Sequence, residues 1–162
     1  MVNISSPPVP VGDEHHVYYG GSSGHHDWWI MGQKEGLDVP EAWDKHVGEY
    51  CLGLATFRRD GFVSLDAGAV REGLWVTHAL RTNGRELVLN AVCGKDGYLR
   101  VEVTDADDNI LEACTMQACD TFTGDDTRHR VTWKGQSRIP HTETLRLRFR
   151  MRNASLYSFG FE

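Results

Sequence analysis

Two unlike parts of the chain meet at Phe57-Arg58-Arg59-Asp60-Gly61-Phe62-Val63-Ser64-Leu65-Asp66-Ala67-Gly68. Before this stretch the sequence is rich in His, Trp and Gly, and its apolar residues are irregularly spaced. After it, short alternating segments separated by turn residues continue to the last residue. Asp60-Gly61 is a tight-turn dipeptide, because glycine reaches positive φ at little steric cost. The sequence therefore predicts a hinge here, with one unit over residues 1–57 and a second over residues 58–162.

The part that follows the hinge is predicted to be an antiparallel β-sandwich. Residues 98–104 alternate cleanly, with Leu99, Val101 and Val103 on one face and Arg100, Glu102 and Thr104 on the other. Short strands with turn signals between them, and no amphipathic helical pattern, are typical of two packed sheets. The expected strands are Phe62–Leu65, Leu74–Leu80, Glu86–Val92, Tyr98–Thr104, Ile110–Cys114, Arg130–Lys134, Thr144–Met151 and Ser155–Phe161.

The part before the hinge is predicted to hold a few strands around a long loop. His15–Tyr19 and Tyr50–Phe57 favour β structure. Residues 22–48 have the composition of a loop, with a short helical turn as an option around Pro40–His46. A loop of this length is uncommon in a compact domain unless it carries function. The overall expectation is an all-β, jelly-roll-like sandwich with an N-terminal β-hairpin.

Composition narrows the classes of partner. A chain of 162 residues fits one domain or one domain plus a fragment, and its net charge of −6 argues against binding nucleic acid or an anionic membrane. The longest apolar run is far short of the roughly 20 residues that a membrane helix needs. The N-terminus lacks the features of a signal peptide, so location stays open. The four cysteines match neither a disulfide scaffold nor a zinc spacing and are predicted to be free thiols.

Ten segments spread over most of the chain carry a resemblance to known proteins. They are Val11–Glu14, Tyr18–Gly21, Leu52–Gly68, Leu87–Asn90, Arg100–Val103, Cys119-Asp120, Gly124-Asp125, Val131–Gly135, Leu145–Phe149 and Leu156–Phe159. Together they resemble the C-terminal region of bacterial glycosyl-hydrolase-like proteins related to the five-bladed propeller glycosidases of families 32 and 43. The run from Leu52 to Gly68 is the specific part of this resemblance.

The resemblance implies that residues 1–57 correspond to the last propeller blade and the remainder to an appended sandwich. It also implies that the blades with the catalytic carboxylates are missing, and it allows a secreted or periplasmic parent protein. The N-terminal strands would then pack on the sandwich, pair with another chain, or belong to a truncated protein. Truncation of a longer glycosidase is therefore one expectation.

The loop that begins at Gly20 is the leading candidate for binding carbohydrate. Aromatic faces stack on the apolar faces of sugar rings, while His and Asp side chains hydrogen-bond hydroxyl groups. The alternative is that the tryptophans cover an exposed sheet edge or contact a partner. The candidate residues are Tyr19, His25, His26, Asp27, Trp28 and Trp29.

A second candidate is a ladder of arginines at alternate positions near the C-terminus. Arg146, Arg148, Arg150 and Arg152 are predicted to share one face of one strand. Arginine binds oxyanions in a bidentate way, so the ladder could grip uronate or sulfate groups. The alternative is a solvated face whose guanidinium groups pair with Asp and Glu on neighbouring strands.

No metal, cofactor or catalytic residue is assigned from the sequence. The acidic segment Asp105–Asn109 fails the EF-hand pattern and is predicted to be an Asx-rich turn. A structural calcium ion stays open as an alternative near Asp120 with Asp125 and Asp126. No pair of carboxylates stands out as a glycosidase acid and base.

The prediction from sequence is thus a non-catalytic, carbohydrate-associated module that binds a glycan or stabilises a glycosidase. Two alternatives are a glycoside hydrolase fragment whose catalytic blades are absent, and an interaction module. The interaction module would form a homo-oligomer, or join a propeller domain, through its N-terminal strands.

Overall fold

The computed structural model describes residues 2–4, 6–23, 32, 34–36, 38, 50–82, 84–140 and 142–162. These residues form two antiparallel sheets, and the named helical element is the short 3₁₀ helix η3 (Glu112–Cys114). The chain divides into the units Met1–Arg59 and Asp60–Glu162, whereas the sequence placed the boundary at residue 57. The predicted all-β antiparallel sandwich is confirmed.

The N-terminal unit is a sheet built around one central strand. Strand β3 (Glu14–Ser22) pairs with β1 (Val2–Ile4) and β2 (Val9–Val11) on one edge and with β4 (Tyr50–Arg58) on the other. Val17 is buried, whereas eight large apolar side chains among the described residues are exposed: Val2, Ile4, Val9, Val11, Tyr18, Tyr50, Leu52 and Leu54. The described residues of this unit therefore leave most of their apolar surface open. The helical turn considered for Pro40–His46 lies outside the described residues.

The hinge forms the predicted tight turn, but by a different residue. Asp60 takes the left-handed conformation with φ of 51°, and Gly61 does not. The backbone N–H of Arg59 donates to the carbonyl of Asp13 at 2.8 Å, which fixes the end of β4. Asp tolerates positive φ because its short side chain can hydrogen-bond locally. The dipeptide therefore predicted the turn correctly, but Asp60 rather than Gly61 adopts the left-handed conformation.

The C-terminal unit is a five-stranded antiparallel sheet with β9 (Leu145–Phe161) at its centre. Strand β7 (Leu87–Asp105) pairs with β9 along one edge, and β8 (Asp125–Arg130) extends the sheet beyond the first part of β7. The short strands β5 (Leu65–Ala67) and β6 (Gly73–Val76) pair with successive parts of the other edge of β9. Every pairing is antiparallel.

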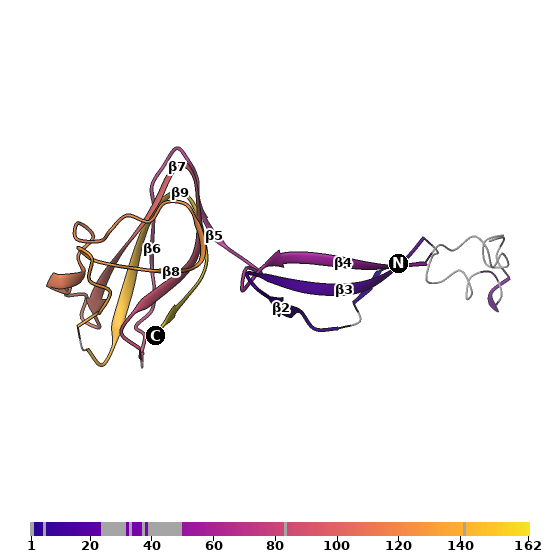
Figure 1. Cartoon of the computed structure of the whole chain (residues 1–162), viewed down its shortest axis with the longest axis horizontal. Coiled ribbons are helices and arrows are strands. Elements are labelled where there is room, and N and C mark those ends of the chain that lie inside the picture. Colours follow the sequence, from indigo (N-terminus) through magenta and orange to yellow (C-terminus); the bar gives the residue numbers. More distant parts are fainter. Residues whose placement is uncertain are drawn as a thin grey trace. The chain divides into compact units, whose positions relative to one another are not determined.

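Strands β7 and β9 bend together, and this bend merges elements that the sequence separated. The predicted strands Glu86–Val92 and Tyr98–Thr104 are the two halves of β7, just as the last two predicted strands are the halves of β9. The pairing register shifts between Cys93 and Tyr98. Figure 1 shows both ribbons turning side by side through this region. The turn signals in the sequence therefore mark a bend rather than a break.

Glycine is required at the bend because two backbones approach closely there. A Cβ on Gly97 would lie 2.1 Å from the carbonyl oxygen of Asn153. Asn153 itself has a φ of 45°, and its side-chain amide donates to the carbonyl of Lys95 at 2.8 Å. These contacts hold the bend of β7 against the bend of β9.

The bend folds the sheet into two layers that share one core. Phe149 and Phe159 are ten residues apart in β9, so a straight strand would separate them by roughly 33 Å. Their ring centroids are 5.7 Å apart. The halves of β9 therefore face each other, and the core between them includes Leu89, Val101 and Trp133. This is the sandwich that the alternating segments predicted.

Four predicted strands of the C-terminal unit are wrong in their bounds. The strand predicted for Leu74–Leu80 is β6, which ends at Val76, and Leu80 makes only an isolated bridge to Leu145. Phe62 and Val63 form an exposed bend, and β5 begins only at Leu65. The segment Ile110–Cys114 makes one bridge, from Ile110 to Thr104, and then enters η3.

A strand was predicted for Arg130–Lys134, but the observed strand β8 precedes this segment and ends at Arg130. Lys134 and Gly135 both have positive φ and close a two-residue turn between Trp133 and Gln136. The indole N–H of Trp133 donates to the carbonyl of Val101 at 2.9 Å. This anchor holds Trp133 in the core outside a regular strand.

Two predicted faces also need correction. Leu99, Val101 and Val103 point into the core as expected, but Glu102 and Thr104 are buried too. The segment after Asp105 covers their side of the sheet, and the backbone N–H of Met116 donates to Glu102 Oε2 at 3.0 Å.

The last strand contains a second irregularity. In a regular strand, Tyr157 would share a face with Phe159 and Phe161. Ala91 pairs with Leu156 and Leu89 with Phe159, so the register shifts between these pairs. Leu156 therefore packs at the core together with Phe159 and Phe161. Tyr157 is the extra residue at the point where the register shifts.

The four cysteines are free thiols in unequal environments. Burial raises the pKa of Cys114 and of Cys119 to about 11. At pH 8 only roughly one in a thousand of such thiols is the reactive thiolate. We expect iodoacetamide to modify exposed Cys51 first and to reach Cys114 and Cys119 only on unfolding, as mass spectrometry of the labelled peptides would show. Labelling of Cys119 at the rate of Cys51 in the folded protein would contradict this placement.

Candidate functional site

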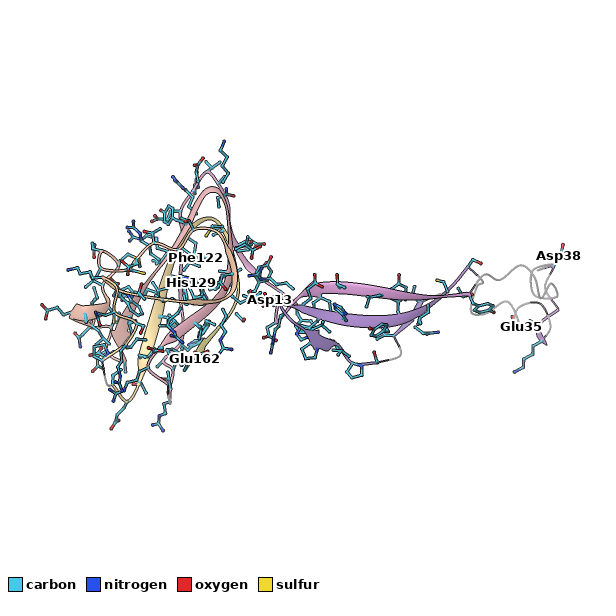
Figure 2. All side chains as sticks on the ribbon, viewed as in Figure 1. Asp13, Glu35, Asp38, Phe122, His129 and Glu162 are labelled. Atoms are coloured by element: carbon cyan, nitrogen blue, oxygen red, sulfur yellow. The ribbon has the colours of Figure 1, made fainter. Side chains whose placement is uncertain are left out.

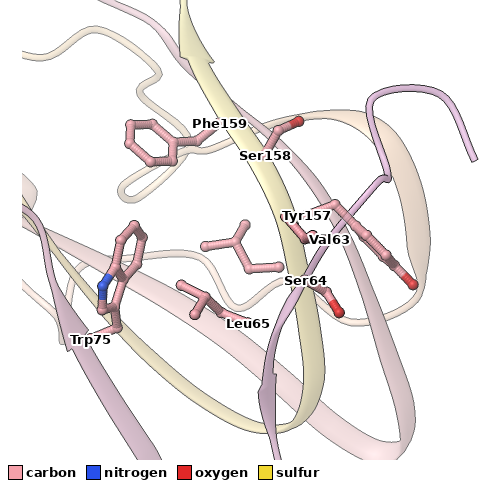
Figure 3. A pocket seen from close by; sticks show the side chains of 8 residues that line it. Val63, Ser64, Leu65, Trp75, Tyr157, Ser158 and Phe159 are labelled. Atoms are coloured by element: carbon pink, nitrogen blue, oxygen red, sulfur yellow. The ribbon is translucent and has the colours of Figure 1, made fainter.

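A cavity of about 380 Å³ opens on the C-terminal unit where β5, β6 and β9 meet. Figure 3 shows Trp75 and Phe159 on one side and Val63, Ser64 and Tyr157 on the other. Leu65, Leu156 and Ser158 complete the lining. Val63 is 77% exposed, so it stands at the mouth. The size suits a small ligand, and the lining combines aromatic faces with a few hydroxyl groups.

Trp75 is held in place from behind. Its ring stacks on Phe149, with 5.1 Å between ring centroids and 25° between the planes. Phe159 meets the same indole edge-on at 6.0 Å. Stacking covers one face of the indole, and Trp75 also lines the cavity. The packing fixes the orientation of this aromatic wall without help from a ligand.

The cavity has few polar groups, and one of them already forms a hydrogen bond within the protein. The Ser64 hydroxyl donates to Asp66 Oδ1 at 2.8 Å. Hydrogen bonds from Ser155 and then Ser64 lower the pKa of Asp66, which keeps that carboxylate ionised. Ser158 lines the cavity as well. The cavity therefore offers hydroxyl groups rather than a charged group to a ligand.

A second cavity, of about 630 Å³, lies on the N-terminal unit. Tyr19, Tyr50, Ser22 and Ser23 are among its lining residues, and Tyr50 is 80% exposed. Tyr19 is thus the sequence-predicted sugar-binding residue that the structure places beside a cavity. Its predicted companions, His25, His26, Asp27, Trp28 and Trp29, lie outside the described residues.

The arginine ladder lies on one face of β9, as predicted, and most of it is paired with acids. Arg146 meets Asp108 at 3.3 Å, and Arg148 meets Glu102 at 3.4 Å and Asp108 at 3.5 Å. This pairing matches the solvated-face alternative for the first part of the ladder.

The end of the ladder near the bend differs. Arg150 meets Glu72 at 3.2 Å. Arg152 instead donates to the backbone carbonyl of Asp96 at 3.5 Å and lies over the ring of Tyr98. Arg146, Arg148 and Arg150 are therefore paired with carboxylates. Arg152 instead contacts a backbone carbonyl and an aromatic ring.

The acidic turns are closed by their own hydrogen bonds. Asp105 accepts from the side chain and backbone of Asn109 and from the backbone of Asp107, and these bonds lower its pKa. Hydrogen bonds from Thr132 and Gly135 do the same for the pKa of Asp120. Among the described residues, no three His, Cys, Asp or Glu side chains are grouped in a way that could hold a metal ion.

The C-terminal residue is tied to the sheet by backbone and side-chain contacts. The Glu162 carboxylate meets Arg128 and Arg130, which lower its pKa. His129 packs against Phe122 with ring centroids 4.3 Å apart, and burial lowers the pKa of this imidazole (Figure 2). These groups stabilise the edge formed by β8 and are distinct from both cavities.

The cavity on the C-terminal unit is the feature that sequence reasoning missed. Trp75 was read as one residue of an ordinary strand, and Val63 as part of another. One signal was available, since Trp75 and Phe159 are large aromatic residues that each lie close to a glycine in the sequence. The sequence did not show that β5 and β6 share one edge of β9, which is what brings these residues together.

In the part of the chain that the structure describes, no helix has both the length and the apolar character of a membrane span. Comparisons with known proteins add no relative: no family model, no curated protein and no solved structure matches this chain.

Proposed function

We propose that this chain is a non-catalytic β-sandwich module that binds carbohydrate, as an accessory to a glycosidase-like protein. The observation that carries the proposal is the cavity walled by Trp75 and Phe159 with Ser64 and Ser158 at its side. An indole face packs on the C–H face of a sugar ring, while hydroxyl groups bond to the ring substituents. The stacking of Trp75 on Phe149 supports this role because an ordered wall loses little entropy on binding.

None of the described carboxylates whose pKa is shifted matches the acid of a glycosidase. A glycosidase requires a carboxylic acid with a raised pKa beside a second carboxylate. The pKa shifts resolved for Asp66, Asp105, Asp120 and Glu162 are all downward, because each accepts hydrogen bonds. These groups are ionised bases rather than proton donors at neutral pH.

A glycan array followed by a tryptophan-fluorescence titration tests the proposal. We expect the full chain to bind a neutral oligosaccharide, and Val63→Glu to weaken binding by about tenfold or more because a charge then sits in the apolar mouth. The matched control is Val70→Glu, since Val70 is 93% exposed and does not line the cavity. Equal binding by both variants would remove the site from this cavity, and hydrolysis of aryl glycosides would overturn the non-catalytic assignment.

A different observation favours a second candidate function, self-association through the N-terminal unit. Strand β4 pairs with β3 over nine residues, and its other edge meets no strand among the described residues. Leu52 and Tyr50 on this strand are about four-fifths exposed. Unpaired strand edges with apolar side chains readily add another strand. Light scattering that shows only monomer at high concentration would exclude this role.

A further inference from the structure

We propose that Tyr98, Arg100 and Arg152 form a binding site for an oxyanion, the sulfate or carboxylate group of an acidic glycan. The site lies on the C-terminal unit, beside the bend of β7 and β9, and apart from the residues that line the cavity at Trp75. This inference rests on the proposed function, because it names a class of glycan that the module would recognise.

The register of the sheet gathers positive charge on one face. Tyr98 pairs with Arg152 and Arg100 pairs with Arg150 across the two strands. Side chains directly opposite each other have Cβ atoms about 4.5–5.5 Å apart, and diagonal neighbours are about 7–8 Å apart. Three guanidinium groups therefore share one small area, with Arg100 and Arg150 in a like-charge pair that opposes folding.

One carboxylate compensates part of this charge. Glu72 pairs with Arg150 at 3.2 Å and also accepts a hydrogen bond from the Tyr98 hydroxyl. Among the described residues, neither Arg100 nor Arg152 forms an ion pair with a carboxylate. Two guanidinium charges therefore stay in excess over the single carboxylate.

The remaining contacts position the two guanidinium groups without neutralising them. Arg100 Nε donates to Thr121 Oγ1 at 2.6 Å, and Arg152 Nη2 donates to the carbonyl of Asp96 at 3.5 Å. Both bonds are to neutral acceptors. Each guanidinium has five N–H donors in a planar fork, so most of its donors stay available for an oxyanion.

The ring of Tyr98 acts as a common support. The guanidinium carbon of Arg152 lies 5.3 Å from the ring centroid, and that of Arg100 lies 6.0 Å from it. Contact with an aromatic face restricts an arginine side chain while leaving its N–H edge exposed. An anion that bridged both groups would also reduce the repulsion between these two guanidinium charges.

The charge of the whole chain favours a sugar-borne anion over a nucleic acid. A nucleic acid presents many phosphates and needs an extended basic surface. This chain has a net charge of −6, and the neighbouring arginines 146 and 148 are already paired with acids. A single sulfate or uronate group needs only the site formed by Tyr98, Arg100 and Arg152. An acidic polysaccharide is therefore the occupant that the local charge and the global charge both allow.

Retention of the full chain on dextran sulfate, with unmodified dextran as the matched neutral matrix, tests the inference. We expect retention on dextran sulfate alone, with elution by sodium sulfate at lower ionic strength than by sodium chloride. Arg100→Gln with Arg152→Gln should weaken binding by about tenfold or more, since both forks are lost. The control Arg128→Gln with Arg130→Gln removes two guanidinium groups that pair with Glu162 and should bind as the parent does.

Melting curves check that each variant is folded, and Arg152→Lys is a second variant at an exposed position if the double change is not tolerated. Lysine keeps the charge but loses the bidentate fork, so we expect elution at lower salt than for the parent. Equal retention of the two double variants, or equal retention on single-stranded DNA, would overturn the site. Binding to neutral glycans without retention here would refute this inference and leave the proposed function standing. Retention on dextran sulfate with no neutral glycan bound on the array would support the anion site and refute binding of neutral carbohydrate at the cavity.

Discussion

Removal of the last seven residues, Leu156–Glu162, is expected to abolish cooperative unfolding of the C-terminal unit. These residues form the second half of β9, which pairs with β7 from Leu87 to Ala91. Leu156 is buried, and Phe159 and Phe161 pack against the core. A fully buried side chain of this kind contributes about 1.5–3 kcal/mol, and a domain is stable by only about 5–15 kcal/mol. Losing Leu156, two partly buried phenylalanines and half of the central strand together removes most of that stability.

Circular dichroism and urea unfolding followed by tryptophan fluorescence would measure the effect. Glu162→Gln is the control, because it keeps the backbone bonds of Glu162 to Arg85 and Glu86 and changes only the exposed carboxylate. We expect this control to unfold in one sharp transition, while the truncated chain shows none. A truncated chain with an unchanged transition would mean that β9 is not central to the sheet.

Phe149→Ala is expected to lower the free energy of unfolding by about 3–5 kcal/mol, the range for removing a buried phenylalanine. Phe149 is fully buried. Its ring touches Trp75 at 5.1 Å and Phe159 at 5.7 Å between centroids, so it joins both layers. The substitution would leave a cavity behind the indole and free it to move. We therefore expect weaker carbohydrate binding by the cavity as well as lower stability.

Urea titration of the parent and the variant gives the stability difference directly. Leu74→Ala is a matched control on the strand that carries Trp75, because Leu74 is 64% exposed. A change at such a surface position is usually within about 0.5 kcal/mol. If the two substitutions cost the same, Phe149 would not occupy the centre of the core.

The sequence could predict the class of fold because the apolar pattern of its strands has period two. The alternation from Leu99 to Val103 is interpretable alone, since its three apolar residues point into the core as their polarity requires. The burial of Glu102 on the other face was not visible in this pattern. The hinge at Asp60 was equally visible as a turn signal. Neighbouring residues in the sequence were sufficient to predict both the fold class and the turn at the hinge.

The sequence could not predict which strands are continuous. Gly94 to Gly97 is typical of a hairpin turn, yet the chain continues as one strand because β9 bends alongside it at Asn153. That outcome depends on a contact between residues far apart in the chain, namely Gly97 against Asn153. A turn pattern in one strand carries no information about its partner.

The candidate sites show the same limit. The arginine ladder was visible as an alternating pattern, but its pairing was not, because the partners Glu102, Asp108 and Glu72 come from other segments. Arg100 was read as an ordinary outward residue, and only the register brings it beside Arg150. The cavity at Trp75 likewise depends on β5 and β6 meeting the same edge of β9.

The central claim is that β9 doubles back, so that its two halves form facing layers around one core. The most direct measurement is a nuclear Overhauser effect between the aromatic protons of Phe149 and Phe159 in the full chain. We expect a clear cross-peak, since the ring centroids are 5.7 Å apart. A straight strand would separate these rings by roughly 33 Å and give no cross-peak, and that result would contradict the two-layer fold.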